Sequence, residues 1–161
     1  MLQSLHVHNF ALIEDAKVEF SDGFNIFTGE TGAGKSLLLG SVNLALGARQ
    51  SGDIVRHGEG SALVELTFLV ENEGTKAALR EAGCETEDDI LVISRRISGG
   101  RSIFRLNGEA ATSAMIKNIS HLLLDIHGQH EHQSLLYNDR QLAILDEYGG
   151  NFWNRTRTTT R

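Results

Sequence analysis

Three stretches of the chain alternate apolar and polar residues, which is the pattern of a strand with one buried face. They span residues 4–10, 13–20 and 62–70. Two more strand-like runs, 91–97 and 102–106, are separated by glycines that favour a tight turn. The pattern therefore predicts a small antiparallel unit at the start of the chain and a hairpin further on.

Residues 36–46 carry apolar side chains at helical spacing, with Leu38 and Val42 on one face and Gly47 at the position of a C-cap. This pattern predicts a helix that is buried on most sides. Gly40 lies inside it, where helix propensity disfavours glycine, so we expect a neighbour to pack closely there.

Shorter helices are predicted over residues 75–82 and 112–118. Two brief apolar runs, 24–28 and 122–126, are expected to form buried strands. The mixture of strands and helices predicts an α/β fold.

Between the run 24–28 and the helix lies the pattern G-x-x-x-x-G-K-S, which is typical of a phosphate-binding loop. Glycines allow successive backbone N–H groups to turn toward a phosphate chain, and the start of the helix adds its positive dipole end. We expect ATP to contact Gly29, Glu30, Thr31, Gly32, Ala33, Gly34, Lys35 and Ser36. Lys35 is expected to reach the terminal phosphates, and the Ser36 hydroxyl is expected to ligate Mg²⁺.

A dense polar segment, residues 127–133, directly follows the run 122–126 and indicates a second part of the site. One interpretation is zinc binding by His127, His130 and His132, although this spacing does not place all three on one face of a helix or strand. The alternative that we favour is that Gln129 acts as a neutral Mg²⁺ ligand or orients a water near the nucleotide.

Two segments imitate other ATPase motifs. Residues 97–101 resemble the signature loop of ABC ATPases, but that loop must open a helix, and here it joins two strand-like runs. Residues 142–147 resemble a Walker B strand. Asn138 as an N-cap and helical apolar spacing favour a helix there, which makes Asp146 a surface carboxylate.

Basic residues gather in two places. The loop 47–60 contains Arg49 and Arg56, either of which could reach phosphates if the loop is more than a connection. The predicted hairpin carries four arginines, interpreted either as a solvated rim or as a DNA contact. They are Arg95, Arg96, Arg101 and Arg105.

The composition is that of an ordinary globular domain: 161 residues, 40% hydrophobic and 22% charged, with a net charge of −6. A net negative charge argues against a surface that is basic all over, as general nucleic-acid binding requires. No apolar run is long enough to span a membrane, and residues 1–5 lack the pattern of a signal peptide, so we expect a cytoplasmic protein. The single cysteine, Cys84, is expected to be an incidental reduced thiol, and His6 and His8 a solvated pair rather than metal ligands.

Four segments together resemble the RecN family of bacterial DNA repair proteins, which are relatives of the SMC (structural maintenance of chromosomes) ATPases. The resemblance covers about residues 1–150 and is carried by residues 9–13, 29–36, 46–49 and 125–133. It implies a P-loop NTPase fold, namely the N-terminal lobe of an ABC/SMC-type head, with a mixed sheet and an antiparallel β subdomain. It also implies that Gln129 is the Q-loop glutamine, which contacts Mg²⁺ and the attacking water.

In this family a coiled coil follows the lobe, and the signature and Walker B motifs come from the C-terminal part of the polypeptide. The resemblance thus implies three partners: that C-terminal half, a second head in a homodimer, and DNA near the nucleoid. The isolated chain is then expected to hydrolyse little ATP. Residues 151–161 depart from the family pattern, and we expect a truncation with an altered reading frame or a vector-derived end.

Two other functions remain open from the residues alone. A small-molecule kinase could use the same phosphate loop, although no acceptor-activating carboxylate is identified. A non-catalytic DNA-binding or assembly module could act through the arginine hairpin, in which case binding would depend on salt and not on Lys35.

Overall fold

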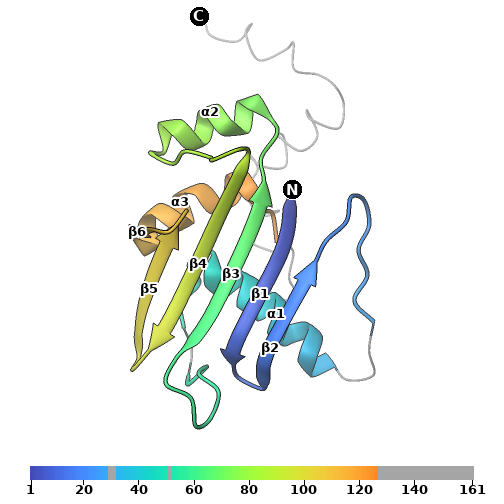
Figure 1. The fold of residues 1–161 in the computed structure, drawn as a ribbon, viewed down its shortest axis with the longest axis vertical. Helices are drawn as coiled ribbons and strands as arrows, with labels where there is room; N and C mark the ends of the chain where they lie inside the picture. The colour runs from blue at the N-terminus through green and yellow to red at the C-terminus, as the bar shows by residue number, and fades with distance from the viewer. Residues whose placement is uncertain (29–31, 51, 127–161) are drawn as a thin grey trace, which may run out of the picture. The chain divides into compact units, whose positions relative to one another are not determined.

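The computed structural model describes residues 1–28, 32–50 and 52–126 of the chain. The chain divides into two compact units, Met1–Asp125 and Ile126–Arg161, and nearly all described residues belong to the first. That first unit is a sheet with helices packed against it (Figure 1).

The described strands form one six-stranded sheet in the order β2-β1-β3-β4-β5-β6, and every pairing among them is antiparallel. Their bounds are Leu2–Phe10 (β1), Ile13–Glu19 (β2), Ala62–Leu69 (β3), Ile90–Ser98 (β4), Arg101–Leu106 (β5) and Glu109–Ala111 (β6). The alternating runs are therefore strands, as predicted. In β3 the alternation is complete: Ala62, Val64, Leu66 and Phe68 are buried and the residues between them are half-buried.

Tight turns set the register of the β4–β5–β6 segment. Ser98 pairs with Arg101 across Gly99 and Gly100, whose φ angles are 54° and 73°. Two successive positive φ angles are typical of the type I′ hairpin turn, whose twist matches that of the strands. Residues 97–101 are therefore a hairpin turn and do not open a helix, as predicted.

Three helices lie in the described part of the chain: α1 (Gly32–Ala45), α2 (Glu73–Glu81) and α3 (Ser113–Leu123). In Figure 1 α1 and α3 lie behind the sheet, and α2 lies beyond one end of its central strands. The core forms between the sheet and these helices, where Leu5, Val64 and Ile93 of the strands are buried together with Val42 of α1 and Ile116 of α3. Burial of this apolar face is the main stabilising term of the unit.

Two predicted strands are wrong. Residues 24–28 form no regular element, and Phe24 and Ile26 are 90% and 70% exposed. A strand needs a hydrogen-bonded neighbour, and the described residues supply none for this segment.

The run 122–126 is not a strand either, because α3 continues to Leu123 and residues 124–126 have no regular structure. The Thr112 hydroxyl accepts the Met115 N–H at 3.1 Å and caps this helix. Buried Ile116 and Ile119 then continue at helical spacing into the apolar run. The helical spacing of the apolar residues, and not the continuous apolar run on which the strand prediction rests, determines the structure of this segment.

Candidate functional site

The helix α1 begins inside the phosphate-loop motif, at Gly32, earlier than the predicted start at residue 36. Gly34, Lys35 and Ser36 therefore lie in its first turn, with Lys35 half-buried and Ser36 exposed. No acidic residue occupies this turn, so the positive end of the helix dipole is left for an anion. Residues 29–31 lie outside the described residues.

The geometry at this end of α1 fits a bound phosphate chain. A Cβ added at Gly34 would have no atom within 4 Å among the described residues, so backbone N–H groups there can be approached closely. Lys35 supplies a cation and Ser36 an exposed hydroxyl on the same turn. These are the groups that a nucleotide with its Mg²⁺ requires.

The rest of α1 is packed against the sheet. Its buried residues Val42, Leu44 and Ala45 face β1, β3 and β4, and the Ser41 hydroxyl donates a 2.7 Å hydrogen bond to the Leu38 carbonyl. This packing fixes the direction of the helix and with it the position of Lys35. The opposite side of α1 is open, and Leu39 is 57% exposed.

Arg95 of β4 holds the other end of α1. Its Nη1 donates to the carbonyls of Leu44 and Ala48 at 2.8 and 2.7 Å, and its Nε and Nη2 donate to the Ser102 hydroxyl at 3.1 and 2.9 Å. The guanidinium lies 4.6 Å from the centre of the Phe104 ring, a cation–π distance. Arg95 is only 5% exposed, and burial lowers the pKa of its guanidinium below its ordinary value.

Neither interpretation of the hairpin arginines, a solvated rim or a DNA contact, therefore holds for Arg95. It faces inward from β4 and uses its donors to cap the carbonyl end of α1. Arg96, Arg101 and Arg105 are exposed. Arg105 donates a 2.6 Å hydrogen bond to the Gly108 carbonyl, and Arg96 a 3.4 Å bond to the Ser61 hydroxyl.

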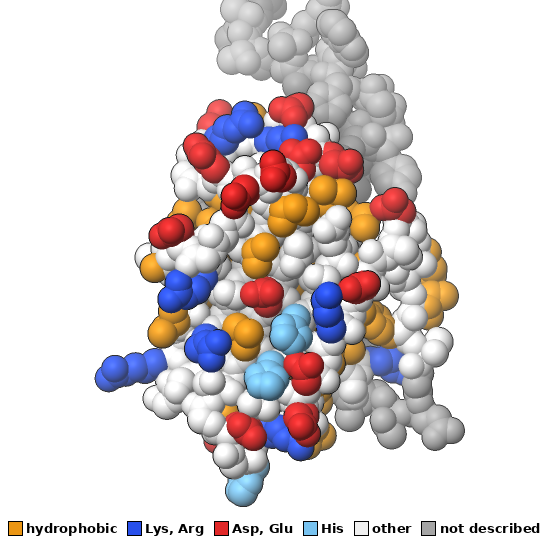
Figure 2. Space-filling model, in the orientation of Figure 1, with side chains coloured by type: hydrophobic (Ala, Val, Ile, Leu, Met, Phe, Trp, Pro, Cys, Tyr) orange, Lys and Arg blue, Asp and Glu red, His pale blue; other side chains and the backbone are white. Residues whose placement is uncertain are grey.

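The outer face of the sheet mixes charges of both signs with histidines (Figure 2). Asp15 accepts hydrogen bonds from His6 at 2.8 Å and His8 at 3.2 Å, and these bonds, that from His6 first, hold the pKa of its carboxyl below the ordinary value. Within the described residues no group of three or more His, Cys, Asp or Glu side chains is arranged to hold a metal. His6 and His8 therefore both contact the Asp15 carboxylate, which the sequence does not identify as their partner.

The loop after α1 contains two arginines with different surroundings. Arg56 donates a 3.1 Å hydrogen bond to the Leu12 carbonyl and lies 3.4 Å from the Glu14 carboxylate, so it ties the loop to the β1–β2 turn. Arg49 is exposed near the C-terminal end of α1. Since the part of α1 that follows the phosphate loop, residues 37–45, extends about 14 Å, Arg49 does not lie beside the loop within this unit.

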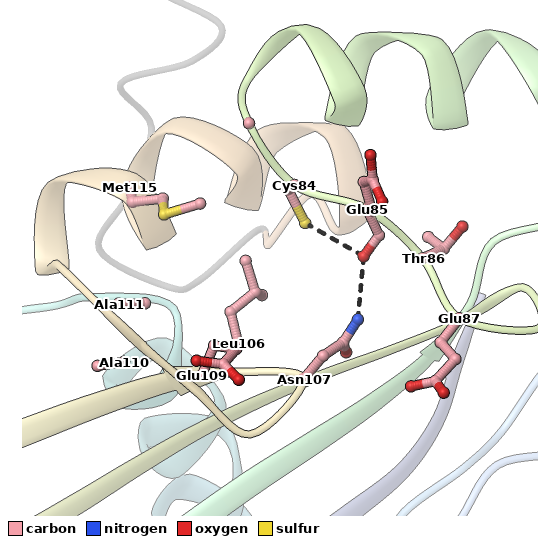
Figure 3. Close-up of a pocket in the computed structure, with 11 residues that line it drawn as sticks. Cys84, Glu85, Thr86, Glu87, Leu106, Asn107, Glu109, Ala110, Ala111 and Met115 are labelled. Carbon is pink, nitrogen blue, oxygen red and sulfur yellow. Dashed lines mark hydrogen bonds between the residues drawn. The ribbon is translucent and has the colours of Figure 1, made fainter.

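A hollow of about 470 Å³ lies between the segment after α2 and the β5–β6 turn (Figure 3). Figure 3 shows the Glu85 carbonyl accepting hydrogen bonds from Asn107 and from the Cys84 thiol. Glu85, Glu87 and Glu109 line this hollow, so it repels phosphates. Cys84 is buried, and burial raises the pKa of its thiol, which keeps it protonated and unreactive.

Several predicted site residues lie outside the described residues. They are Gln129, His127, His130, His132, the Walker B-like segment 142–147 and the tail 151–161. Their proposed roles remain predictions. Among the helices that the structure does describe, none is both long and apolar enough to cross a bilayer.

Comparisons with known proteins show the family to which the chain belongs. Residues 4–151 match the family model described as AAA domain. The DNA repair protein RecN of Halalkalibacterium halodurans is 41% identical over 93% of this chain, which spans 27% of that protein. RecN of Bacillus subtilis is also 41% identical over 93% of the chain, which spans 26% of that protein. The chain thus covers about a quarter of the length of these relatives.

Solved structures show the same fold. A chain from a study of ATP-driven dimerization and DNA-stimulated activation of SMC ATPases superposes with a TM-score of 0.64 at 24% identity, covering 91% of this chain and 98% of that one. An Smc head domain with an extended coiled coil, derived from Pyrococcus furiosus, gives a TM-score of 0.66 at 23% identity over 93% of this chain and 43% of that one. The prediction of an α/β fold of the SMC-type P-loop lobe is confirmed. The mixed sheet that we expected is not found among the described strands, which pair only antiparallel. The chain belongs to the AAA domain family of P-loop proteins and, within it, is a homologue of the bacterial RecN proteins.

Proposed function

We propose that the chain is the nucleotide-binding lobe of a RecN-type DNA repair ATPase and that the loop 29–36 holds Mg-ATP. The observation that carries this proposal is the start of α1, which presents Lys35, Ser36 and backbone N–H groups left unpaired by the helix, in a turn that contains no acidic residue. Lys35 would balance charge on the terminal phosphates, and the Ser36 hydroxyl would help to hold Mg²⁺. When bound, Mg²⁺ would supply neutralisation of the phosphate charge.

Hydrolysis requires groups that lie elsewhere. Gln129 is proposed to orient the attacking water and to contact Mg²⁺, and the signature serine and catalytic glutamate are proposed to come from the remainder of the longer polypeptide and from a second head. The lobe is then one half of a composite site. The isolated chain binds nucleotide but turns over little of it.

Exposed hydrophobic residues support this incompleteness. Phe24, Ile26 and Leu39 are large hydrophobic residues with exposures of 90%, 70% and 57%. Gly40 is exposed in α1, and an added Cβ there would have no atom within 4 Å among the described residues. The neighbour that we expected at Gly40 is therefore not among those residues. We propose that the C-terminal half of the same head covers these residues.

DNA is the proposed substrate of the assembled protein, because the relatives are named DNA repair proteins. The proposed location is the cytoplasm, near the nucleoid. Arg96 and Arg101 remain exposed on the outer hairpin, but nothing in the described geometry selects them for DNA over solvent.

The test is a titration of the chain with a fluorescent ATP analogue and Mg²⁺. Lys35→Ala is expected to weaken binding at least about tenfold, the usual worth of a charge-assisted contact to phosphate. Lys17→Ala is the matched control, since Lys17 is an exposed lysine on β2 whose ammonium pairs with Glu19. Equal affinities of the Lys35 and Lys17 variants would contradict the proposal.

Turnover provides the second readout. The unmodified chain is expected to show negligible ATPase activity. Robust hydrolysis that is abolished by Glu147→Gln but not by Gln129→Ala would mean that the chain holds a complete site of its own, with a working Walker B segment in 142–147.

A further inference from the structure

A second hollow, of about 620 Å³, lies at the opposite end of α1 from the phosphate loop. Three elements surround it: the segment after α1, the β4–β5 hairpin and the start of α3. The polar side chains that line it are Arg49, Gln50, Arg95, Ser102, Thr112, Ser113 and Lys117. Its other lining residues include no carboxylate, in contrast to the hollow beside Cys84.

The hollow concentrates positive charge in a chain whose net charge is −6. Arg49 and Lys117 are exposed, and among the described residues neither forms an ion pair with a carboxylate. Two unpaired cations from separate elements at one cavity are the arrangement that attracts an anion.

Arg95 of β4 adds a third cation to the lining of the hollow. It is 95% buried, yet its hydrogen-bond acceptors are two backbone carbonyls and a hydroxyl, with no carboxylate among the described residues within ion-pair distance. The carbonyl end of α1 offsets only about half a unit of charge. A buried cation normally has a counter-ion, so this one leaves a positive potential at the floor of the hollow.

Close packing holds the Lys117 stem in place. Gly47 has a φ of 93°, and a Cβ added to it would lie 2.7 Å from Lys117 Cγ and 3.4 Å from the Ser113 carbonyl oxygen. Glycine at this position thus lets the α1 C-terminus approach α3 closely enough for the lysine stem to lie against it. The ammonium group is thereby kept at the hollow.

The start of α3 completes the site. Its first turn contains no acidic residue, and the Thr112 hydroxyl satisfies only the Met115 N–H. The remaining N–H groups of this turn and the Ser113 hydroxyl are suited to an anion beside the two exposed cations.

We propose that this hollow is a phosphate-binding site, separate from the nucleotide loop, that takes a phosphate group of a DNA backbone or of a soluble polyphosphate. The nine residues of α1 that follow the loop, 37–45, place it at least about 14 Å from the loop, at 1.5 Å per residue. The proposal does not depend on nucleotide binding at Lys35.

The experiment is calorimetric titration of the full chain carrying Lys35→Ala, which removes the competing phosphate loop. Pyrophosphate is the probe in one arm and a short DNA duplex in the other. Lys117→Ala and Arg49→Ala, added singly, are each expected to weaken binding about tenfold, since a charge-assisted contact to phosphate has that worth. Lys117→Arg retains the charge and is expected to recover most of the affinity.

Arg80→Ala, an exposed arginine in the last turn of α2, is the matched control and is expected to change nothing. If Lys117→Ala and Arg49→Ala weaken binding of the duplex, the ligand is a DNA backbone. If they weaken binding of pyrophosphate alone, the ligand is a soluble polyphosphate. The proposal is overturned if neither probe binds the Lys35→Ala chain, or if Arg80→Ala weakens binding as much as Lys117→Ala. Circular dichroism of each variant confirms that the fold is retained.

Discussion

The two ends of α1 differ in whether their backbone groups are already bound by other parts of the chain. At the N-terminal end the first turn is partly open, with Ser36 exposed and space beside Gly34. At the C-terminal end the carbonyls of Leu44 and Ala48 are taken by a buried arginine. One end is left to accept a ligand, and the other is fixed to the sheet.

This difference explains how the start of α1 can be positioned. The packed face of α1 and the Arg95 contacts fix the helix against β1, β3 and β4, so its first turn is presented in a constant direction. Preorganised N–H groups bind phosphate without an ordering cost at the moment of binding. If this account is right, changes at the fixed end affect stability, and changes at the open end affect nucleotide affinity.

The largest stability effect is expected for Arg95→Met. The methionine fills part of the space but leaves the Ala48 carbonyl without its donor and the Leu44 carbonyl with the Gly47 N–H alone, and the loss is expected to be about 3 kcal/mol. Urea denaturation measures it. The neighbouring Arg96→Ala is the control, because Arg96 is exposed and its change should cost less than about 0.5 kcal/mol. Equal losses for the two variants would show that α1 is not held by Arg95.

A smaller loss is expected for Gly47→Ala. Alanine at a φ of 93° is strained, and its Cβ meets the Lys117 stem, so the expected cost is about 1–3 kcal/mol. Gly40→Ala tests the same substitution inside the helix, where the space is open. It is expected to stabilise the isolated chain by up to about 1 kcal/mol. Thermal unfolding compares the two, and a stabilising Gly47→Ala would refute close packing at the fixed end.

The smallest effect belongs to the outer face, away from both ends of α1. The pKa of Asp15 is lowered in the folded state, so its ionisation stabilises the fold above its ordinary pKa of 3.8, and this stability is lost as the pH falls through the lowered value. Asp15→Asn should therefore slightly lower the stability at neutral pH and flatten its fall below about pH 4, so that the variant and the unmodified chain converge in acid. Urea midpoints measured from neutral to acid pH test this, and an unchanged acid slope would argue against the Asp15 contacts.

Much of the sheet was predictable because local pattern determines it. Alternation located β1, β2 and β3, and the pair Gly99-Gly100 indicated the β4–β5 turn correctly. The short strand β6 was missed, although Asn107-Gly108 is a strong two-residue hairpin signal and both residues have positive φ. Asn107-Gly108 therefore predicts the β5–β6 hairpin from the sequence alone.

The inward position of Arg95 could also have been found. Leu91, Ile93 and Ile97 form the buried face of β4, and residue 95 has the same parity. The prediction of an exposed Arg95 rests on its charge, whereas the two-residue period of the strand places its side chain on the buried face. Residues 24–28 are a different case, because an apolar run forms a strand only when a neighbour pairs with it, and no local pattern reveals whether that neighbour is present.

Amide hydrogen exchange of the chain with and without Mg-ATP tests the central claim most directly. We predict slower exchange at residues 29–36 with ATP, no such slowing in Lys35→Ala, and little change at Leu44 and Ala48, whose end of α1 Arg95 already holds. Unchanged exchange at residues 29–36 under saturating Mg-ATP would contradict it.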